Sequence, residues 1–199
     1  MTIHEHPLMD ALLHRRTAEV RALLVQGRGT NRPDSLGKYP FWVAMEDDAL
    51  FRLLLDHQAD VTVRDRQGDT ILHRIAEDGV PAHVPLVLAH GLAVDVRNAQ
   101  QQTPLHAAAA AGHGAVAAAL LAEGADVNAV DARGQTPLHY AVYGAITPMT
   151  VAQHAITGRL LLQAGANPAA RLPTGETPRD LALLHGYPEL HALFERLGD

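Results

Sequence analysis

The hexapeptide TPLHAA at residues 103–108 returns 33 residues later as TPLHYA at residues 136–141. A period of this size is typical of a solenoid, in which each repeat is one small unit that buries its apolar face only against its neighbours. A solenoid presents an extended surface, which favours binding of another molecule over catalysis in a closed pocket.

The best copy of the repeat predicts two short helices. Thr103 is a favourable N-cap, and Pro104 suits the first helical turn, where its missing N–H costs nothing. We expect this helix to end at Gly112, because glycine readily adopts the left-handed conformation of a helix stop. A second helix over residues 115–123 is expected to end at Gly124 for the same reason.

Apolar residues predict how the repeats pack. Leu105, Leu120 and Leu121 are expected to fill the seam between adjacent repeats, and the many alanines let the helices approach closely. No segment rich in Pro, Gly or Ser divides the 199 residues, and a hydrophobic content of 47% suffices for a sizeable core. We therefore expect one domain.

TPLHAA, together with GADVNA at residues 124–129, resembles the signature of the ankyrin repeat. The match is strong in two repeats and covers nearly the whole chain in weaker form. The resemblance implies an all-α solenoid, an ankyrin repeat stack with short hairpin-like loops and six repeats including two caps. The predicted bounds of repeats 1 to 6 are residues 4–33, 34–64, 65–97, 98–130, 131–171 and 172–199.

Repeats 2 and 5 depart from the pattern. Repeat 2 is two residues short at the turn between its helices, and Trp42 stands where the other repeats have histidine. For this tryptophan we favour core packing over partner contact. Repeat 5 carries about eight extra residues near 144–157, which lengthen the turn or one helix. They are either a tolerated loop insertion or an excursion that contacts a partner through Met149 and His154.

Composition and charge argue against several classes of protein. The net charge of −6 argues against nucleic-acid binding, which needs a basic stripe. The absence of cysteine excludes disulfides and zinc ribbons. The sequence shows no targeting or membrane-spanning segment, so we expect a cytoplasmic protein. Lys38 is the single lysine among 16 basic residues, which indicates a bacterial gene. The oligomeric state stays open, with a monomer favoured.

The residue inventory points away from an enzyme. With no Cys, one Lys and one Ser, the usual nucleophile and base pairs are missing. His73, His106 and His139 recur once per repeat, but stacked helices lie about 8–10 Å apart, too far for two of these rings to share a zinc ion at about 2.0–2.1 Å. In the ankyrin family this histidine hydrogen-bonds around the Thr-Pro turn. We therefore expect no catalytic residues, no metal and no cofactor.

The resemblance also implies binding through a concave face built from hairpin tips and the ends of the first helices. The tip positions are Asp34, Ser35, Leu36, Lys38, Arg66, Gln67, Asp69, Ala99, Gln100, Gln102, Ala132, Arg133, Gln135, Thr174 and Glu176. The helix-end positions are Glu46, Asp47, Glu77, Asp78, Ala110, Ala111, Tyr143 and Gly144.

Charge narrows this surface to a set of candidate partner-binding residues. The acids of residues 46–48 and 77–78 should converge into an acidic patch for a basic element of a partner, unless they serve only solubility. Ala110 and Ala111 leave room beside the patch, and Tyr143 offers an aromatic anchor. The candidates are Glu46, Asp47, Asp48, Arg66, Asp69, Glu77, Asp78, Gln102, Arg133, Gln135, Tyr143 and Met149.

The resemblance therefore implies a non-catalytic protein–protein interaction module. Within that class we expect an immunity or inhibitor protein that neutralises a toxin or effector by covering its active surface. The alternative is an accessory or scaffold factor that supports a cellular enzyme such as a catalase.

Overall fold

The chain folds into a stack of helix pairs. The computed structural model describes residues 6–27, 29–144, 148–186, 191–192 and 194. The helices of this part are α1 (Pro7–Leu13), α2 (Thr17–Val25), α3 (Pro40–Val43), α4 (Asp48–Asp56), α5 (Ile71–Asp78), α6 (Val84–Ala89), α7 (Pro104–Ala111), α8 (Gly114–Ala122), α9 (Pro137–Tyr143), α10 (Pro148–Gln163) and α11 (Pro178–Leu184). Two 3₁₀ turns, η2 (Ala44–Glu46) and η3 (Pro81–His83), precede α4 and α6. The predicted all-α solenoid is confirmed.

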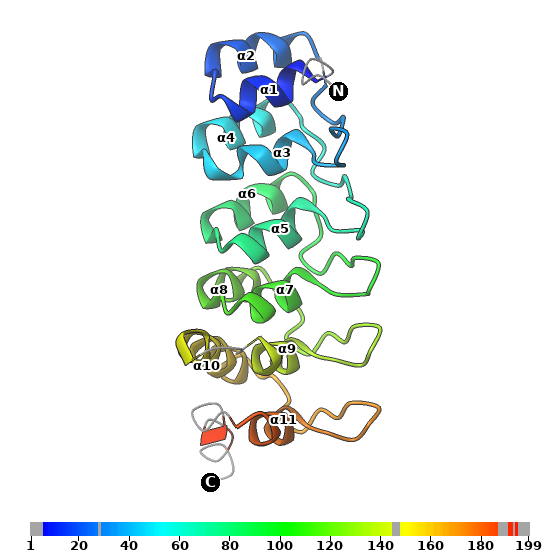
Figure 1. Ribbon diagram of the computed structural model, residues 1–199, viewed down its shortest axis with the longest axis vertical. Helices are drawn as coiled ribbons and strands as arrows, with labels where there is room; N and C mark the ends of the chain where they lie inside the picture. Colours follow the sequence, from blue (N-terminus) through cyan, green and yellow to red (C-terminus); the bar gives the residue numbers. More distant parts are fainter. Residues whose placement is uncertain (1–5, 28, 145–147, 187–190, 193, 195–199) are drawn as a thin grey trace.

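First and second helices form two parallel columns (Figure 1). Neighbouring first helices contact one another along the stack, from α1 through α3, α5, α7 and α9 to α11. Loops between the pairs project to one side as hairpins, and the two chain ends lie at opposite ends of the stack. We call the surface formed by the first helices and these hairpins the first-helix face.

The central repeat shows why these residues form these elements. Thr103 caps α7 in an extended conformation, Pro104 occupies the first turn, and Gly112 ends the helix with φ +73°. The second helix begins one residue earlier than predicted, at Gly114. Leu105 and Leu120 are fully buried in the core and Leu121 is packed against it, which confirms the predicted seam.

In repeats 3 and 4 the repeat histidine joins the start of the first helix to the next repeat. In repeat 4, Nδ1 of His106 accepts the N–H of Thr103 at 3.1 Å, and Nε2 donates to the carbonyl of Gln135 at 3.1 Å. His73 makes the same pair of bonds to Thr70 and Gln102. The expected structural role of this histidine is thus confirmed, and it requires the neutral ring with the proton on Nε2.

Backbone hydrogen bonds join the hairpins of repeats 3, 4 and 5 to one another. The Ala99 N–H donates to the Gln67 carbonyl at 3.0 Å, and the Ala132 N–H donates to the Gln100 carbonyl at 3.0 Å. Four of the five hairpins have a glycine of positive φ at the turn, whereas the hairpin of repeat 4 holds Gln101 there with φ +62°. The hairpins of repeats 3, 4 and 5 therefore form a connected row, and Gln101 keeps the turn geometry without glycine.

Repeat 2 is built differently. Its first helix, α3, covers only four residues and passes into η2, because two residues are missing before α4. No glycine stop is present. Instead the Asp47 carboxylate accepts the N–H groups of Ala49 and Leu50, each at 3.1 Å, and caps α4. The shortened turn leaves this repeat without the regular helix end of its neighbours.

The extra residues of repeat 5 lengthen its second helix. α10 spans 16 residues, compared with nine in α8. His154 lies in this helix with 2% of its surface exposed, and its Nε2 is 3.0 Å from the Ala110 carbonyl oxygen. The suggestion that His154 contacts a partner is therefore wrong, because the previous repeat buries it. Residues 145–147 and the side chain of Met149 lie outside the described residues.

Candidate partner-binding site

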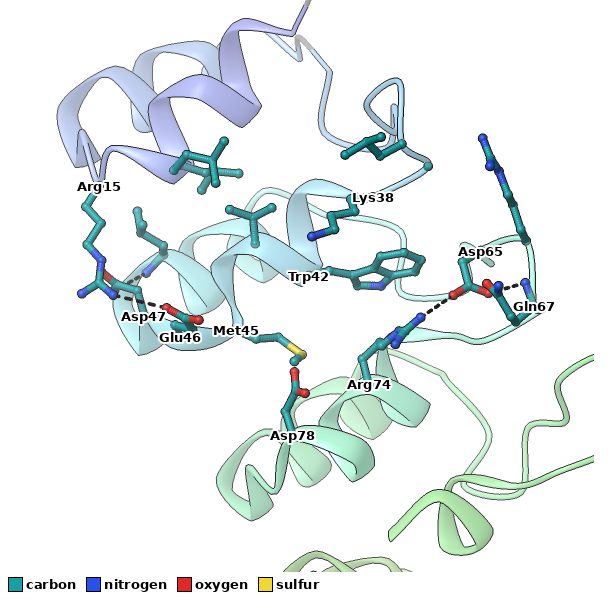
Figure 2. Close-up of a pocket in the computed structure, with 17 residues that line it drawn as sticks. Arg15, Lys38, Trp42, Met45, Glu46, Asp47, Asp65, Gln67, Arg74 and Asp78 are labelled. Carbon is teal, nitrogen blue, oxygen red and sulfur yellow. Dashed lines mark hydrogen bonds and ion pairs between the residues drawn. The ribbon is translucent and has the colours of Figure 1, made fainter. Parts of the chain in front are cut away.

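A pocket of about 530 Å³ lies on the first-helix face between repeats 1, 2 and 3 (Figure 2). Its lining comes from α1, α3 with η2, α4, α5 and the hairpins before α3 and α5. The lining residues are Leu12, Leu13, Arg15, Leu36, Gly37, Lys38, Trp42, Val43, Met45, Glu46, Asp47, Leu50, Asp65, Arg66, Gln67, Arg74 and Asp78.

Trp42 forms part of the pocket wall. Its ring packs against the core, as the sequence predicted, and is half-buried against Tyr39 with ring centroids 5.2 Å apart. The Arg74 guanidinium carbon lies 5.5 Å from the indole centroid, within cation–π range. The indole nitrogen, Nε1, is buried and has no hydrogen-bond acceptor in the described part of the chain. Trp42 is therefore both a packing residue and a lining residue.

Arg74 forms ion pairs with two acids, of which Asp65 lines the pocket and Glu77 does not. Its guanidinium donates to Asp65 at 2.8 Å and to Glu77 at 2.7 Å. Burial raises the pKa of Glu77 above its usual value, although the Arg74 charge opposes this. Because both terminal nitrogens of Arg74 are used, its positive charge is balanced within the protein.

Charged residues on the pocket's two rims differ in sign. The hairpin rim consists of Lys38 and Arg66, which form no ion pair within the described residues. The helix-end rim consists of Arg15, Glu46, Asp47 and Asp78. Arg15 and Glu46 make an exposed pair at 3.6 Å, and exposed pairs of this kind contribute little stability.

Glu46, Asp47 and Asp78 thus meet around one pocket, as expected, but not in a uniformly acidic patch. Four carboxylates and four cationic side chains line the pocket. The expectation of a net acidic surface is therefore corrected here, because hairpin cations reach the same space as the helix-end acids.

Asp48 is placed away from the pocket. Its carboxylate accepts a hydrogen bond from Nε2 of buried His83 at 2.6 Å and forms an ion pair with Arg52 at 3.7 Å. The hydrogen bond from His83 is the largest cause of the lowered pKa of Asp48. This acid therefore joins the start of α4 to the turn before α6.

Asp69 and Gln102 belong to an internal network of the hairpins. The Asn98 amide donates to Asp69 at 2.8 Å and to Gln102 at 3.0 Å. Gln102 in turn donates to the Tyr140 hydroxyl at 2.5 Å, which donates to Asp131 at 2.8 Å. Burial, and next the bond to Asp131, raises the pKa of Tyr140 to about 12. These residues hold three hairpins together, and a binding role for Asp69 and Gln102 stays a prediction.

The remaining candidates lie further along the first-helix face. Arg133 is exposed at its hairpin tip, and the Gln135 carbonyl accepts the bond from His106. Tyr143 is 38% exposed and stands edge-on to His185 with centroids 5.7 Å apart. None of these residues lines the pocket, so a partner would have to extend over the stack to meet both regions.

Several interactions between repeats were not predicted from the sequence. Arg64 donates to the carbonyl of Arg97 at 2.6 Å, and Arg97 donates to that of Val130 at 2.7 Å. The spacing of 33 residues between these arginines was a signal that could have found them. His113 similarly reaches the Ala76 carbonyl at 3.1 Å.

Arg15 is another unpredicted feature. It adopts a left-handed conformation with φ +52°, at the end of α1. The corresponding stops of α5 and α7 are Gly79 and Gly112, where an added Cβ would lie 2.9 Å from the ring of His113 or His154. The shortened turn of repeat 2 has no such histidine, so position 15 can carry a side chain that reaches the pocket.

Comparisons with known proteins match this architecture. The family model "Ankyrin repeats (3 copies)" matches residues 75–148, and "Ankyrin repeat" matches residues 133–171. A crystal structure of the ankyrin repeat protein EF0377 is similar with a TM-score of 0.82 and 23% identity, over 98% of both chains. An ankyrin repeat domain from Acinetobacter baumannii AYE (ABAYE2397) has a TM-score of 0.82 and 27% identity, again over 98% of both chains. The search among curated proteins finds no match.

The described residues provide neither a metal cluster nor a membrane-spanning helix. They contain no group of three or more His, Cys, Asp or Glu side chains placed to hold a metal ion. None of their helices has the length and apolar character needed to cross a membrane. Repeat signature, capped helix pairs, joined hairpins and family matches lead to one conclusion: the chain is an ankyrin repeat protein.

Proposed function

We propose that this chain is a non-catalytic module that binds a partner protein through its first-helix face, centred on the pocket between repeats 1, 2 and 3. Ankyrin repeats are generally protein–protein interaction modules. The observation that most supports the proposal is the pocket itself, which combines Trp42, two exposed leucines and unpaired cations on one surface. Tryptophan and arginine are the residue types enriched at the energetic centres of interfaces.

The mode of action we propose is inhibition of the partner, as an immunity protein inhibits its toxin, by covering the partner's active surface. The mixed charge of the pocket lining does not support the idea of a purely basic partner. An elongated first-helix face of six predicted repeats suits a broad contact that blocks access.

Partner binding is tested by affinity. The full chain is used to co-purify its partner from source cells, and the affinity of the isolated pair is measured by calorimetry. We expect Asp78→Lys to weaken binding about tenfold, through a lower association rate. Arg159→Glu, an exposed change on α10, is the matched control and should leave the affinity within about twofold. Equal affinities of the unmodified chain, Asp78→Lys and Arg159→Glu for the partner would contradict the proposal that the partner binds at this surface.

The mode of action is tested by the partner's own activity. Adding the full chain in stoichiometric excess should abolish that activity if the chain is an inhibitor. An unchanged or increased activity would overturn inhibition and favour the accessory role instead.

A further inference from the structure

The pocket has electrical polarity. Its hairpin rim carries the exposed side chains of Lys38 and Arg66, whereas its helix-end rim carries three carboxylates against the single cation of Arg15. Between the rims, Asp65 and Arg74 neutralise each other at 2.8 Å. A complementary occupant therefore presents a negative group toward the hairpins and a positive group toward the helix ends.

Beside this ion pair, apolar side chains also lie between the two rims. Trp42, Val43 and Met45 lie there, as Figure 2 shows for the two that it labels. Leu13 and Leu36, which also line the pocket, are 62% and 72% exposed. Water contact with large apolar side chains is unfavourable, so an apolar group that covers these leucines is bound favourably.

Two hydrogen-bond donors in the wall also lack an acceptor. Trp42 Nε1 and Arg74 Nε are both buried without a partner among the described residues. Buried donors are nearly always paired in folded proteins. The Arg74 side chain is 34% exposed, so it can shift and let a carbonyl oxygen of an incoming segment approach both donors.

The lining composition favours a polypeptide over a small molecule. Eight of the 17 lining residues are charged, whereas small-molecule pockets are lined mainly by apolar side chains with few polar groups. An apolar centre with an aromatic anchor and a charged rim is instead the usual anatomy of a protein–protein interface.

We infer that this pocket receives one segment of the partner protein, in which an apolar residue stands between an acidic and a basic residue. The acidic residue meets Lys38 and Arg66, the apolar residue covers Trp42 and Met45, and the basic residue meets Glu46 and Asp78. This inference rests on the proposed function and adds the chemistry of the contact.

Trp42 makes the inference measurable, because it is the only tryptophan in the chain. The probe is a displayed library of random peptides about ten residues long, selected against the full chain. Selected peptides are synthesised and titrated against the protein while the Trp42 fluorescence is recorded. Arg159→Glu is the matched control, since it reverses an exposed charge on α10 outside the pocket.

We expect the selected peptides to share the acidic, apolar, basic pattern and to change the Trp42 emission. Lys38→Glu should weaken peptide binding roughly fivefold. A peptide whose acidic residue is replaced by Lys should bind the Lys38→Glu protein with the original affinity. Circular dichroism checks that Lys38→Glu, an exposed change, keeps the fold. Arg159→Glu should bind the same peptides normally.

Three results would overturn the inference: no enriched peptide, enriched peptides without the pattern, or binding that leaves the Trp42 emission unchanged. None of them removes the proposed function, which is tested separately by the affinity of the isolated partner. If that partner binds while the peptides fail, only the chemistry assigned to the pocket is lost.

Discussion

Repeats 4 and 2 of this chain have different residues at the start of the first helix. In repeat 4, Thr103 and His106 satisfy the start of the first helix and tie it to the next hairpin. In repeat 2, Tyr39 and Trp42 occupy those positions, and no side-chain cap is formed at Tyr39. The regular repeat has used its polar groups internally, whereas the irregular repeat borders a pocket. Departures from the repeat are therefore where a partner is most usefully sought.

The chemistry of the two rings explains this difference. A neutral histidine carries one donor and one acceptor, so its ring can accept from its own helix cap and donate to the next hairpin. An indole carries a donor only, and here that donor is buried without an acceptor. Trp42 cannot replace the histidine's bonds, and the space beside it is open to another molecule.

The largest expected effect on stability comes from replacing a core leucine of repeat 4, and we compare it with the same change in repeat 2. Leu120→Ala should lower the free energy of unfolding by about 2–5 kcal/mol, because the seam of repeat 4 is enclosed by its neighbours. Leu50→Ala should lie at the lower end of that range, because Leu50 lines the pocket and the new space opens toward it. Urea unfolding of both variants measures the difference. A loss well under 1 kcal/mol for Leu120→Ala would contradict the assigned register.

Acid should destabilise the regular repeats. Burial lowers the pKa of His106 to about 4 and also lowers the pKa values of His73 and His139. In the unfolded chain the pKa of histidine is about 6.5. Between pH values equal to the folded and unfolded pKa, the unfolded chain therefore binds more protons than the folded chain. The free energy of unfolding is highest above about pH 6.5 and decreases as the pH falls toward about 4. For His106 alone the loss at about pH 5 is about 2 kcal/mol.

Urea unfolding at about pH 5 and about pH 8 tests this dependence. His106→Gln is the matched control, since glutamine at this helix position can still reach the cap N–H but does not titrate. We expect its stability to change less with pH than that of the unmodified chain. Identical slopes would show that His106 does not carry the effect.

The smallest expected effect concerns a hairpin of the regular repeat. Gln101 holds the left-handed conformation that glycine holds in the other four hairpins. Gln101→Gly should raise the free energy of unfolding by about 0.5–1 kcal/mol, since removing the strain outweighs the added freedom of the unfolded chain. Gln100→Gly, at a neighbouring position without positive φ, should give no gain. A thermal melt of the two variants decides between them.

The sequence allowed the regular part of the fold to be predicted for a local reason. Thr103, Pro104 and Gly112 act within one helix, so their roles follow from capping chemistry and recur with the period. The helix starts were predicted to within about one residue.

The pocket could not be predicted in this way. Lys38 and Leu36 were placed on the hairpin tips, and Glu46, Asp47, Arg66 and Asp78 were chosen as candidates, but nothing in the pattern placed the cations beside the acids. Arg15 has a left-handed backbone at the end of α1, where α5 and α7 have glycine stops, and its side chain lines the pocket beside residues of the next repeats. Such contacts involve three repeats at once. An alignment of the repeats retains only the features that they share, so it does not reveal these contacts.

The most direct test of this account is the affinity of the isolated partner for Trp42→His, which gives repeat 2 the residue of the regular repeats. We predict a loss of about tenfold or more, as expected for an anchor at the centre of an interface, with the helical circular dichroism retained. Tyr143→Ala, measured beside it, should change the affinity less than about threefold. Full affinity for Trp42→His together with a large loss for Tyr143→Ala would contradict the claim that the partner is recognised at the irregular repeat.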